Sequence, residues 1–313
     1  MPQTILNTIR RHEVTHIFAV PMLWNRVYDQ AIRTIRERGD ATWNKFQKGM
    51  RISRKLAGVP WLYRSFARLA FKEIRQNIFG DSISFMISGG SEIRSCVLEF
   101  MNAIGYHLAN GYGMTEIGIT SVELSRDIRL LCSGSVGEPF DSLEYRVDEN
   151  QQLLVRGKSM AKCIMENGQE RSRGDGWFAT GDLCECRDGH YYILGRRDDH
   201  VISPSGENLN PNLIEEKLEG DGILGVCLTS IKNDGEVSPV LVASVPPLIS
   251  GDKLKKTRQN LMERMETLGL NQVGRIVFVK EPLMEPEEIK LNRKHVAARL
   301  QEGRFTIVEA ESI

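Results

Sequence analysis

The sequence predicts an α/β domain, then a small antiparallel β-barrel, then an α+β domain. A strand at 82–87, a Gly-rich turn, a helix at 94–104 and a strand at 106–108 form a βαβ unit, which is typical of mostly parallel sheets. After Leu124, short alternating strands separated by turns predict a small antiparallel sheet or barrel. Beyond Arg196, helical and strand patterns mix again. A chain of 313 residues, 41% of them hydrophobic, is long enough for two domains.

Periodicity predicts the elements before that unit. Residues 4–11 are predicted to form a helix and residues 16–20 a buried strand. Apolar residues recur at spacings of three and four over 23–79, with interruptions near Gly39 and at 58–60, which predicts three helices.

Lys and Arg outnumber acidic residues between 33 and 75. We favour solvated helix faces with snorkelling side chains as the interpretation. The alternative is a surface that attracts the phosphates of a nucleotide, of coenzyme A or of an anionic membrane, which leaves peripheral membrane contact as a hypothesis.

Two domains are predicted for the whole chain. Residues 1–195 hold the βαβ sheet to about 125 and the barrel-like part at 126–195, and residues 196–313 form the smaller domain. Strands of the barrel-like part are predicted at 134–140, 143–147, 152–157, 161–165, 177–186 and 191–196, with Asp188 and Gly189 closing a hairpin. Later elements are helices at 213–218, 254–268 and 292–300 and strands at 222–230, 239–245 and 275–279.

Composition argues against several classes of protein. Net charge is zero and the pI is near 7, so no global charge favours a nucleic-acid partner. No apolar run approaches the roughly 18 residues of a membrane-spanning helix, and no secretory signal is visible. The six cysteines lack zinc spacing, and Cys184 and Cys186 share one predicted strand. We therefore expect reduced thiols and a cytoplasmic location.

Three segments are expected to contact a ligand. The Gly-rich turns at 88–90 and 110–113 follow neighbouring parallel strands and should meet at one edge of the sheet. The segment 175–211 holds an acidic turn at 180–182 and four consecutive charges at 196–199, between tight turns. This pattern predicts a joint between two folded bodies that also contacts a ligand.

The sequences TGDL, GRRDD and SPSGENLNP within that segment resemble the adenylate-forming superfamily of acyl-CoA synthetases, luciferases and peptide-synthetase adenylation domains. The GEN-x-x-P form, followed by Ile214 and Glu215, is most similar to long-chain acyl-CoA synthetases. NGYGMTE resembles the superfamily's nucleotide motif, and EEIKLNRKHV its last motif. The resemblance implies an adenylate-forming enzyme fold, truncated at the N-terminus, with a large AMP-binding domain and a small mobile lid domain.

The resemblance implies a nucleotide site. Its residues are Ser88, Gly89, Gly90, Asn110, Gly111, Tyr112, Gly113, Asp182, Arg196 and Arg197. Tyr112 would lay its ring on adenine, beside the backbone wall at 88–90. Asp182 would accept hydrogen bonds from both ribose hydroxyls, since a carboxylate has two oxygens. Arg196 would reach ribose or phosphate, whereas Arg197 is either a similar contact or a solvated charge.

The same resemblance implies residues for phosphate, metal and thiol chemistry. Thr115 would contact the α-phosphate and Glu116 would help to hold Mg²⁺. Lys290 would bridge the substrate carboxylate and the α-phosphate, with Arg293 and Lys294 as rivals because Ile289 replaces the usual Gly.

Two further residues would serve the movement of the lid domain. Asp198 would be the hinge on which that domain rotates between half-reactions. Gly206 would line the coenzyme A tunnel.

The leading functional hypothesis is an enzyme that ligates a carboxylic acid, expected to be a fatty acid, to coenzyme A through an acyl-adenylate. ATP, Mg²⁺ and coenzyme A are the expected cofactors, AMP and pyrophosphate are released, and residues 119–121 are expected to border the acid. The alternatives are an acyl-AMP ligase that loads an acyl carrier protein and a non-catalytic AMP-binding module. The Ser/Thr/Gly-rich phosphate loop is absent, so we expect this chain alone to be incomplete for catalysis.

Overall fold

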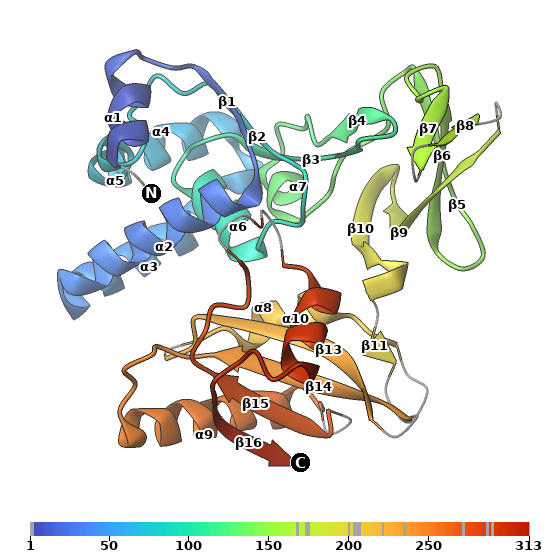
Figure 1. Ribbon diagram of the computed structural model, residues 1–313. Coiled ribbons are helices and arrows are strands. Elements are labelled where there is room, and N and C mark those ends of the chain that lie inside the picture. The colour runs from blue at the N-terminus through green and yellow to red at the C-terminus, as the bar shows by residue number, and fades with distance from the viewer. Residues whose placement is uncertain are drawn as a thin grey trace. The chain divides into compact units, whose positions relative to one another are not determined.

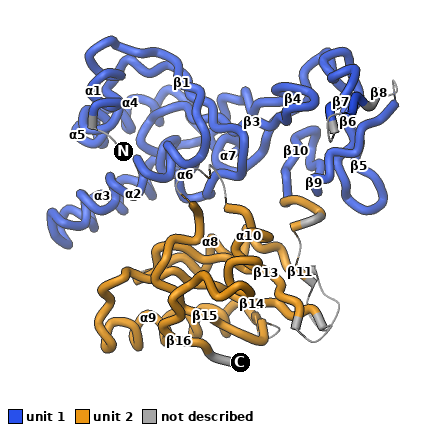
Figure 2. The backbone as a smooth tube through the Cα atoms, viewed as in Figure 1, with its two compact units in different colours: residues 1–194 blue, residues 195–313 orange. Residues whose placement is uncertain are grey.

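Figure 1 shows the computed structural model of the protein. The structure describes residues 3–166, 169–172, 176–199, 201–202, 208–220, 222–233, 236–270, 273–285, 288 and 291–312. The chain divides into two compact units, residues 1–194 and 195–313 (Figure 2).

The first unit is built on a four-stranded sheet in the order β1-β2-β3-β4. The strands are β1 (His16–Ala19), β2 (Phe85–Ser88), β3 (Leu108–Met114) and β4 (Gly118–Val122). β1, β2 and β3 run parallel, and β4 pairs antiparallel with β3. Ser88 lies opposite both Ala19 and Asn110, so β1 and β2 end level with each other, whereas β3 continues past them to Met114.

The predicted turn at 110–113 is wrong, because these residues belong to β3. Their backbone pairs with β4, and the chain reverses instead at 115–117, where Ile117 N donates to the carbonyl of Met114 at 3.1 Å. The glycines of this strand permit a close approach. A Cβ on Gly113 would lie 2.4 Å from the carbonyl oxygen of Gly118. Glycine here therefore serves strand contact, not turn geometry.

Helices surround this sheet (Figure 1). They are α1 (Gln3–Arg11), α2 (Pro21–Glu37), α3 (Asp40–Lys55), α4 (Pro60–Ala70), α5 (Lys72–Asn77), α6 (Ser95–Ala103) and the short α7 (Ile128–Cys132). The region 23–79 holds four α-helices instead of the predicted three, because Phe71 leaves helical geometry at φ −114°. The Phe71 ring is buried edge-on against Phe46 and Phe66, so burial of this ring accompanies the break.

The outer face of α4 exposes Trp61 and Leu69, with 71% and 80% of their surface accessible. Both lie within the basic region 33–75, whose contact with a membrane stays a prediction. Among the described helices, none has the length and apolar character needed to cross a bilayer.

The rest of the first unit is a curled antiparallel sheet in the order β10-β9-β6-β5. Its strands are β5 (Leu143–Val147), β6 (Gln152–Gly157), β9 (Phe178–Arg187) and β10 (His190–Arg196), and a separate hairpin pairs β7 (Cys163–Glu166) with β8 (Gln169–Ser172). Asp188 and Gly189 close the β9–β10 hairpin with φ of 50° and 85°. The strand predicted at 134–140 is wrong, because this segment forms an isolated bridge, from Pro139 to Ser121, and no strand in the described part of the chain.

The predicted acidic turn at 180–182 is a bulge inside β9. Ala179 lies opposite Leu154 and Leu183 opposite Gln152, so three residues of β9 face the single residue Leu153 of β6. Gly181 takes the positive φ of 77° within this irregularity. A bulge redirects the side chains next to it, and here the redirected side chain is that of Asp182.

The second unit is an α+β body on the sheet β13-β14-β15-β16. The elements are β11 (Val201–Ile202), β12 (Asn208–Leu209), α8 (Pro211–Leu218), β13 (Gly225–Asn233), β14 (Glu236–Ser244), α9 (Gly251–Thr267), β15 (Arg275–Val279), α10 (Arg293–Gln301) and β16 (Ile307–Ser312). One apolar cluster of the sheet includes residues of α8 and α9, and the other includes residues of α10. Helices were predicted at all three places, and the amphipathic pattern was the ground for α9. Strands β11, β12 and β16 were not predicted.

Candidate nucleotide-binding site

The edge of the parallel sheet places two Gly-containing segments side by side. Gly89 follows β2 and donates its amide to the Ala19 carbonyl at 3.2 Å, and a Cβ at Gly89 would lie 3.5 Å from the carbonyl oxygen of Gly111. Ser88 is fully buried, and its Oγ has no hydrogen-bond partner among the residues that the structure describes. A buried hydroxyl without a partner is uncommon.

Tyr112 and Asp182 meet although 70 residues separate them in the sequence. Tyr112 comes from β3 and Asp182 from the bulge of β9, and the phenol donates a hydrogen bond to Oδ2 of the carboxylate. Burial, together with the negative charge of Asp182, raises the pKa of Tyr112 well above its usual value. The phenol therefore keeps its proton and remains a donor at neutral pH.

Backbone and hydroxyl contacts hold Asp182 in place. Its amide donates to Oγ1 of Thr180 at 3.0 Å, and that hydroxyl donates to the carbonyl of Leu153 at 2.8 Å. Only 8% of Asp182 is accessible. A carboxylate restrained in this way meets a ligand with little loss of side-chain entropy.

A second layer of hydroxyls supports Tyr112. Thr120 donates to the carbonyl of Tyr112 at 3.0 Å, and the hydroxyl of Tyr145 lies within hydrogen-bond distance of Thr120 Oγ1 and, at 3.1 Å, of Ser121 Oγ. Burial raises the pKa of Tyr145 to about 12. Thr120 and Ser121 are fully buried, whereas half of Ile119 is accessible. Of the three residues predicted to border the acid, Ile119 alone presents its side chain to solvent.

Sequence reasoning missed a buried polar cluster around Glu123. Its carboxylate accepts hydrogen bonds from Ser135 Oγ at 2.6 Å and from Ser125 N at 3.0 Å, and its Oε2 lies 2.9 Å from His190 Nδ1. Glu123 follows β4 and His190 begins β10, so the cluster ties the two sheets of the first unit together. The sequence offers no motif that would have identified it.

Thr115 and Glu116 occupy the turn between β3 and β4. Thr115 is exposed and Glu116 half-buried, and the Glu116 carbonyl accepts a hydrogen bond from Ala161 N at 2.8 Å. Within the described part of the chain, no three His, Cys, Asp or Glu side chains gather to hold a metal ion.

The other predicted site residues belong to the second unit. Arg196 and Arg197 are exposed, and Asp198 lies in the 3₁₀ turn Arg197–Asp199. Lys290 and Gly206 lie outside the described residues. Of the two rivals to Lys290, Lys294 is exposed on α10. Arg293 donates a hydrogen bond to Glu215 at 2.6 Å, and it would have to break this contact to reach a substrate.

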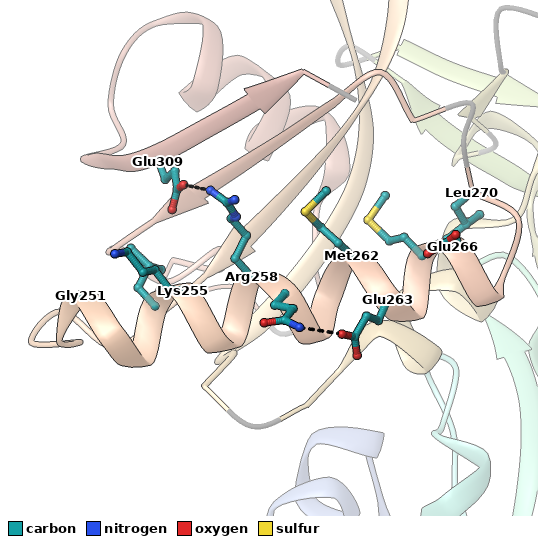
Figure 3. A pocket seen from close by; sticks show the side chains of 11 residues that line it. Gly251, Lys255, Arg258, Met262, Glu263, Glu266, Leu270 and Glu309 are labelled. Atoms are coloured by element: carbon teal, nitrogen blue, oxygen red, sulfur yellow. Dashed lines mark hydrogen bonds and ion pairs between the residues drawn. The ribbon is translucent and has the colours of Figure 1, made fainter.

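A cavity of about 790 Å³ also lies in the second unit, along α9 (Figure 3). Its lining includes the apolar residues Leu254, Met262 and Met265. Arg258, which also lines it, pairs with Glu309 of β16. None of the predicted site residues lines it.

Comparison with known proteins identifies the family. The sequence profile described as AMP-binding enzyme matches residues 1–165, more than half of the chain. This chain belongs to the AMP-binding enzyme family. The predicted resemblance to adenylate-forming enzymes is confirmed.

Relatives of this AMP-binding family member include ligases for different acceptors. A long-chain-fatty-acid–CoA ligase of Mycobacterium bovis is 26% identical over 62% of this chain and 32% of its own length. A chloroplastic long-chain-fatty-acid–[acyl-carrier-protein] ligase of Arabidopsis thaliana is 26% identical over 80% of this chain and 39% of its own length. The chain thus spans about a third of the length of these relatives.

A solved structure supports the fold. The o-succinylbenzoate CoA synthetase of Bacillus subtilis, in complex with its acyl-adenylate intermediate, matches 94% of this chain and 53% of its own with a TM-score of 0.62. The identity of 21% makes this a likeness of fold. The predicted adenylate-forming enzyme fold is thereby confirmed.

Proposed function

We propose that this chain forms the adenylate-binding part of a ligase that joins a carboxylic acid to coenzyme A. The observation that carries the proposal is the hydrogen bond that brings the Tyr112 ring beside the Asp182 carboxylate. An aromatic ring beside a restrained carboxylate suits an adenosine, because the ring stacks on the base and the carboxylate accepts from the ribose hydroxyls.

The proposed first half-reaction joins the acid to AMP. Attack of the acid's carboxylate on the α-phosphorus of ATP forms the acyl–phosphate bond and breaks the bond to pyrophosphate. Thr115 would contact the α-phosphate, and Glu116 would share Mg²⁺ with phosphate oxygens. Lys290 would stabilise the charge that develops between carboxylate and phosphate.

The proposed second half-reaction transfers the acyl group to a thiol. The thiolate attacks the acyl carbon, a thioester forms and AMP leaves. Coenzyme A is the acceptor that we propose, since the Mycobacterium relative is a CoA ligase, and a long-chain fatty acid is the proposed substrate class on the same ground. A carrier-protein thiol is the second candidate, favoured by the Arabidopsis relative.

ATP–pyrophosphate exchange driven by a panel of acids tests the proposal. The assay compares this chain alone with a form extended upstream through a phosphate loop, called the extended form below. Exchange is expected in the extended form only, and the best acid names the substrate. No exchange in an extended form that is folded and binds ATP would contradict the ligase function.

Lys290→Ala is expected to lower the exchange rate of the extended form about 100-fold, as loss of one charge-stabilising group commonly does. Lys294→Ala is the matched control and should stay within about twofold, because Lys294 is an exposed residue of α10. The reverse ranking would assign the catalytic charge to Lys294.

Asp198→Pro is expected to slow thioester formation about tenfold more than adenylation, because proline fixes φ near −65° and a hinge must change its dihedrals. Single-turnover assays of each half-reaction measure the two rates. Asp198→Ala, which leaves the backbone free, is the control and should keep their ratio. Equal loss of both rates in the proline variant would remove Asp198 as the hinge.

A further inference from the structure

Arg293 connects four elements of the second unit. Its Nη2 donates to Asn212 Oδ1 and, at 2.6 Å, to Glu215 Oε2, and its Nη1 lies 3.7 Å from Asp199 Oδ2. The carbonyl of Arg293 also accepts from Thr229 Oγ1 of β13 at 3.1 Å. One residue of α10 thereby contacts α8, β13 and the 3₁₀ turn Arg197–Asp199.

The pairing is buried and directional. The Arg293 side chain is 9% accessible and that of Glu215 is 12%, and Glu215 is itself oriented by a 2.7 Å hydrogen bond from Leu228 N. Replacing a buried ion pair by apolar residues is often neutral or stabilising, so stability alone gives weak grounds for such a cluster. A planar guanidinium with several donors is suited to fixing the relative positions of several partners.

Arg293 and its partner Asp199 lie close in the sequence to two residues with proposed roles in the reaction. Asp199, which Arg293 holds, immediately follows the proposed hinge Asp198, and Arg293 itself lies three residues after Lys290. On the other side of Lys290, Glu288 is tied to His295 of α10 at 2.8 Å. The buried Arg293 guanidinium, at the start of α10, therefore contacts Asp199, the residue that follows the proposed hinge.

We infer that Arg293 is a positioning residue that clamps the 3₁₀ turn Arg197–Asp199, beside the hinge, to one rigid body of α8, β13 and α10. The inference rests on the proposed role of Asp198. With Asp199 held, a rotation has to be absorbed at Asp198.

Arg299 provides a matched control on the same helix. Its side chain is 7% accessible, and it donates to the carbonyls of Pro282 and Leu283 at 3.1 and 3.2 Å and pairs with Glu285. These contacts anchor residues 282–285, away from the 3₁₀ turn in the sequence. Loss of Arg299 thus perturbs a buried arginine of α10 without touching the proposed clamp.

Amide hydrogen exchange, followed by mass spectrometry on this chain, tests the inference without any need for catalysis. Arg293→Lys keeps the positive charge and loses the planar guanidinium, which can donate to several partners at once. We expect about tenfold faster exchange at 196–202, with α9 unchanged. Arg299→Lys is expected to speed exchange at 281–285 and to leave 196–202 unchanged.

Asp199→Asn supplies the second arm. It should reproduce the faster exchange at 196–202, and the double variant with Arg293→Lys should add no further increase, because partners in one interaction are not additive. The clamp would be overturned if Arg293→Lys left exchange at 196–202 unchanged or accelerated it everywhere, α9 included. It would also be overturned if Arg299→Lys changed exchange at 196–202 equally, or if the effects of Asp199→Asn and Arg293→Lys were additive. The ligase proposal is tested separately, by pyrophosphate exchange. Failure of the clamp can therefore be distinguished from failure of the ligase function.

Discussion

Asp182→Ala is expected to lower kcat/KM for adenylation about 1,000-fold in the extended form. The variant removes the carboxylate proposed to accept from both ribose hydroxyls, and hydrogen bonds to a charged group are worth about 1.5–3 kcal/mol each. Loss of two such bonds would lower kcat/KM by about two to four powers of ten. Titration with AMP and ATP–pyrophosphate exchange measure the loss in binding and in rate.

Two control variants separate ligand contact from architecture. Tyr112→Phe keeps the ring and loses only the hydrogen bond to Asp182, so a loss of about tenfold is expected. Glu185→Ala removes an acid from the same strand, where it is paired with Arg187 on the surface, and should change kcat/KM less than about twofold. Equal losses in Asp182→Ala and Glu185→Ala would contradict a ribose contact.

Gly113→Ala is expected to destabilise the first unit by about 3 kcal/mol, because a Cβ in a packed strand forces the backbone apart. The added carbon would lie 2.4 Å from Gly118 O and 2.9 Å from the Cα of Ile119, both backbone atoms that cannot rotate away. Thermal unfolding should show a midpoint lowered by roughly 6–12 °C. Tyr112, the neighbouring residue, should lose its alignment with Asp182 at the same time.

Gly58→Ala is the control for that prediction. A Cβ there would have no atom within 4 Å, and Gly58 does not have a positive φ. Alanine should therefore leave the unfolding midpoint within about 2 °C or raise it slightly, because it reduces the entropy of the unfolded chain. An unchanged thermal unfolding midpoint in Gly113→Ala would mean that β3 and β4 can move apart at little cost. The close approach of Gly113 to Gly118 would then not contribute to stability.

The regular elements followed from local pattern where the pattern was strong. The strand at 275–279 and the hairpin turn at Asp188 and Gly189 agree with the structure, because buried β-branched runs and an Asp-Gly pair carry their own local preference. The helix break at Phe71 and the edge strand β16 carry no such signal. Their positions depend on packing against distant residues, which local periodicity does not contain.

Glycine was the main source of error near the site. Asn110–Gly113 was predicted as a turn because Asn and Gly favour turns, yet pairing with β4 makes these residues a strand. The acidic turn at 180–182 is likewise a bulge in β9. In both places glycine permits a close contact or an unusual φ inside a sheet, and composition alone does not distinguish these uses.

The sequence by itself determined the family and the residue types of the candidate site, because motif order and spacing are local properties of the chain. The order of the sheet strands, the hydrogen bond from Tyr112 to Asp182 and the cluster of Arg293 with Asp199 and Glu215 were decided by tertiary structure. The contacts of Tyr112 with Asp182 and of Arg293 with Glu215 join residues 70 and 78 positions apart. They form only when burial of the apolar faces brings separate elements together, and no local pattern encodes that pairing.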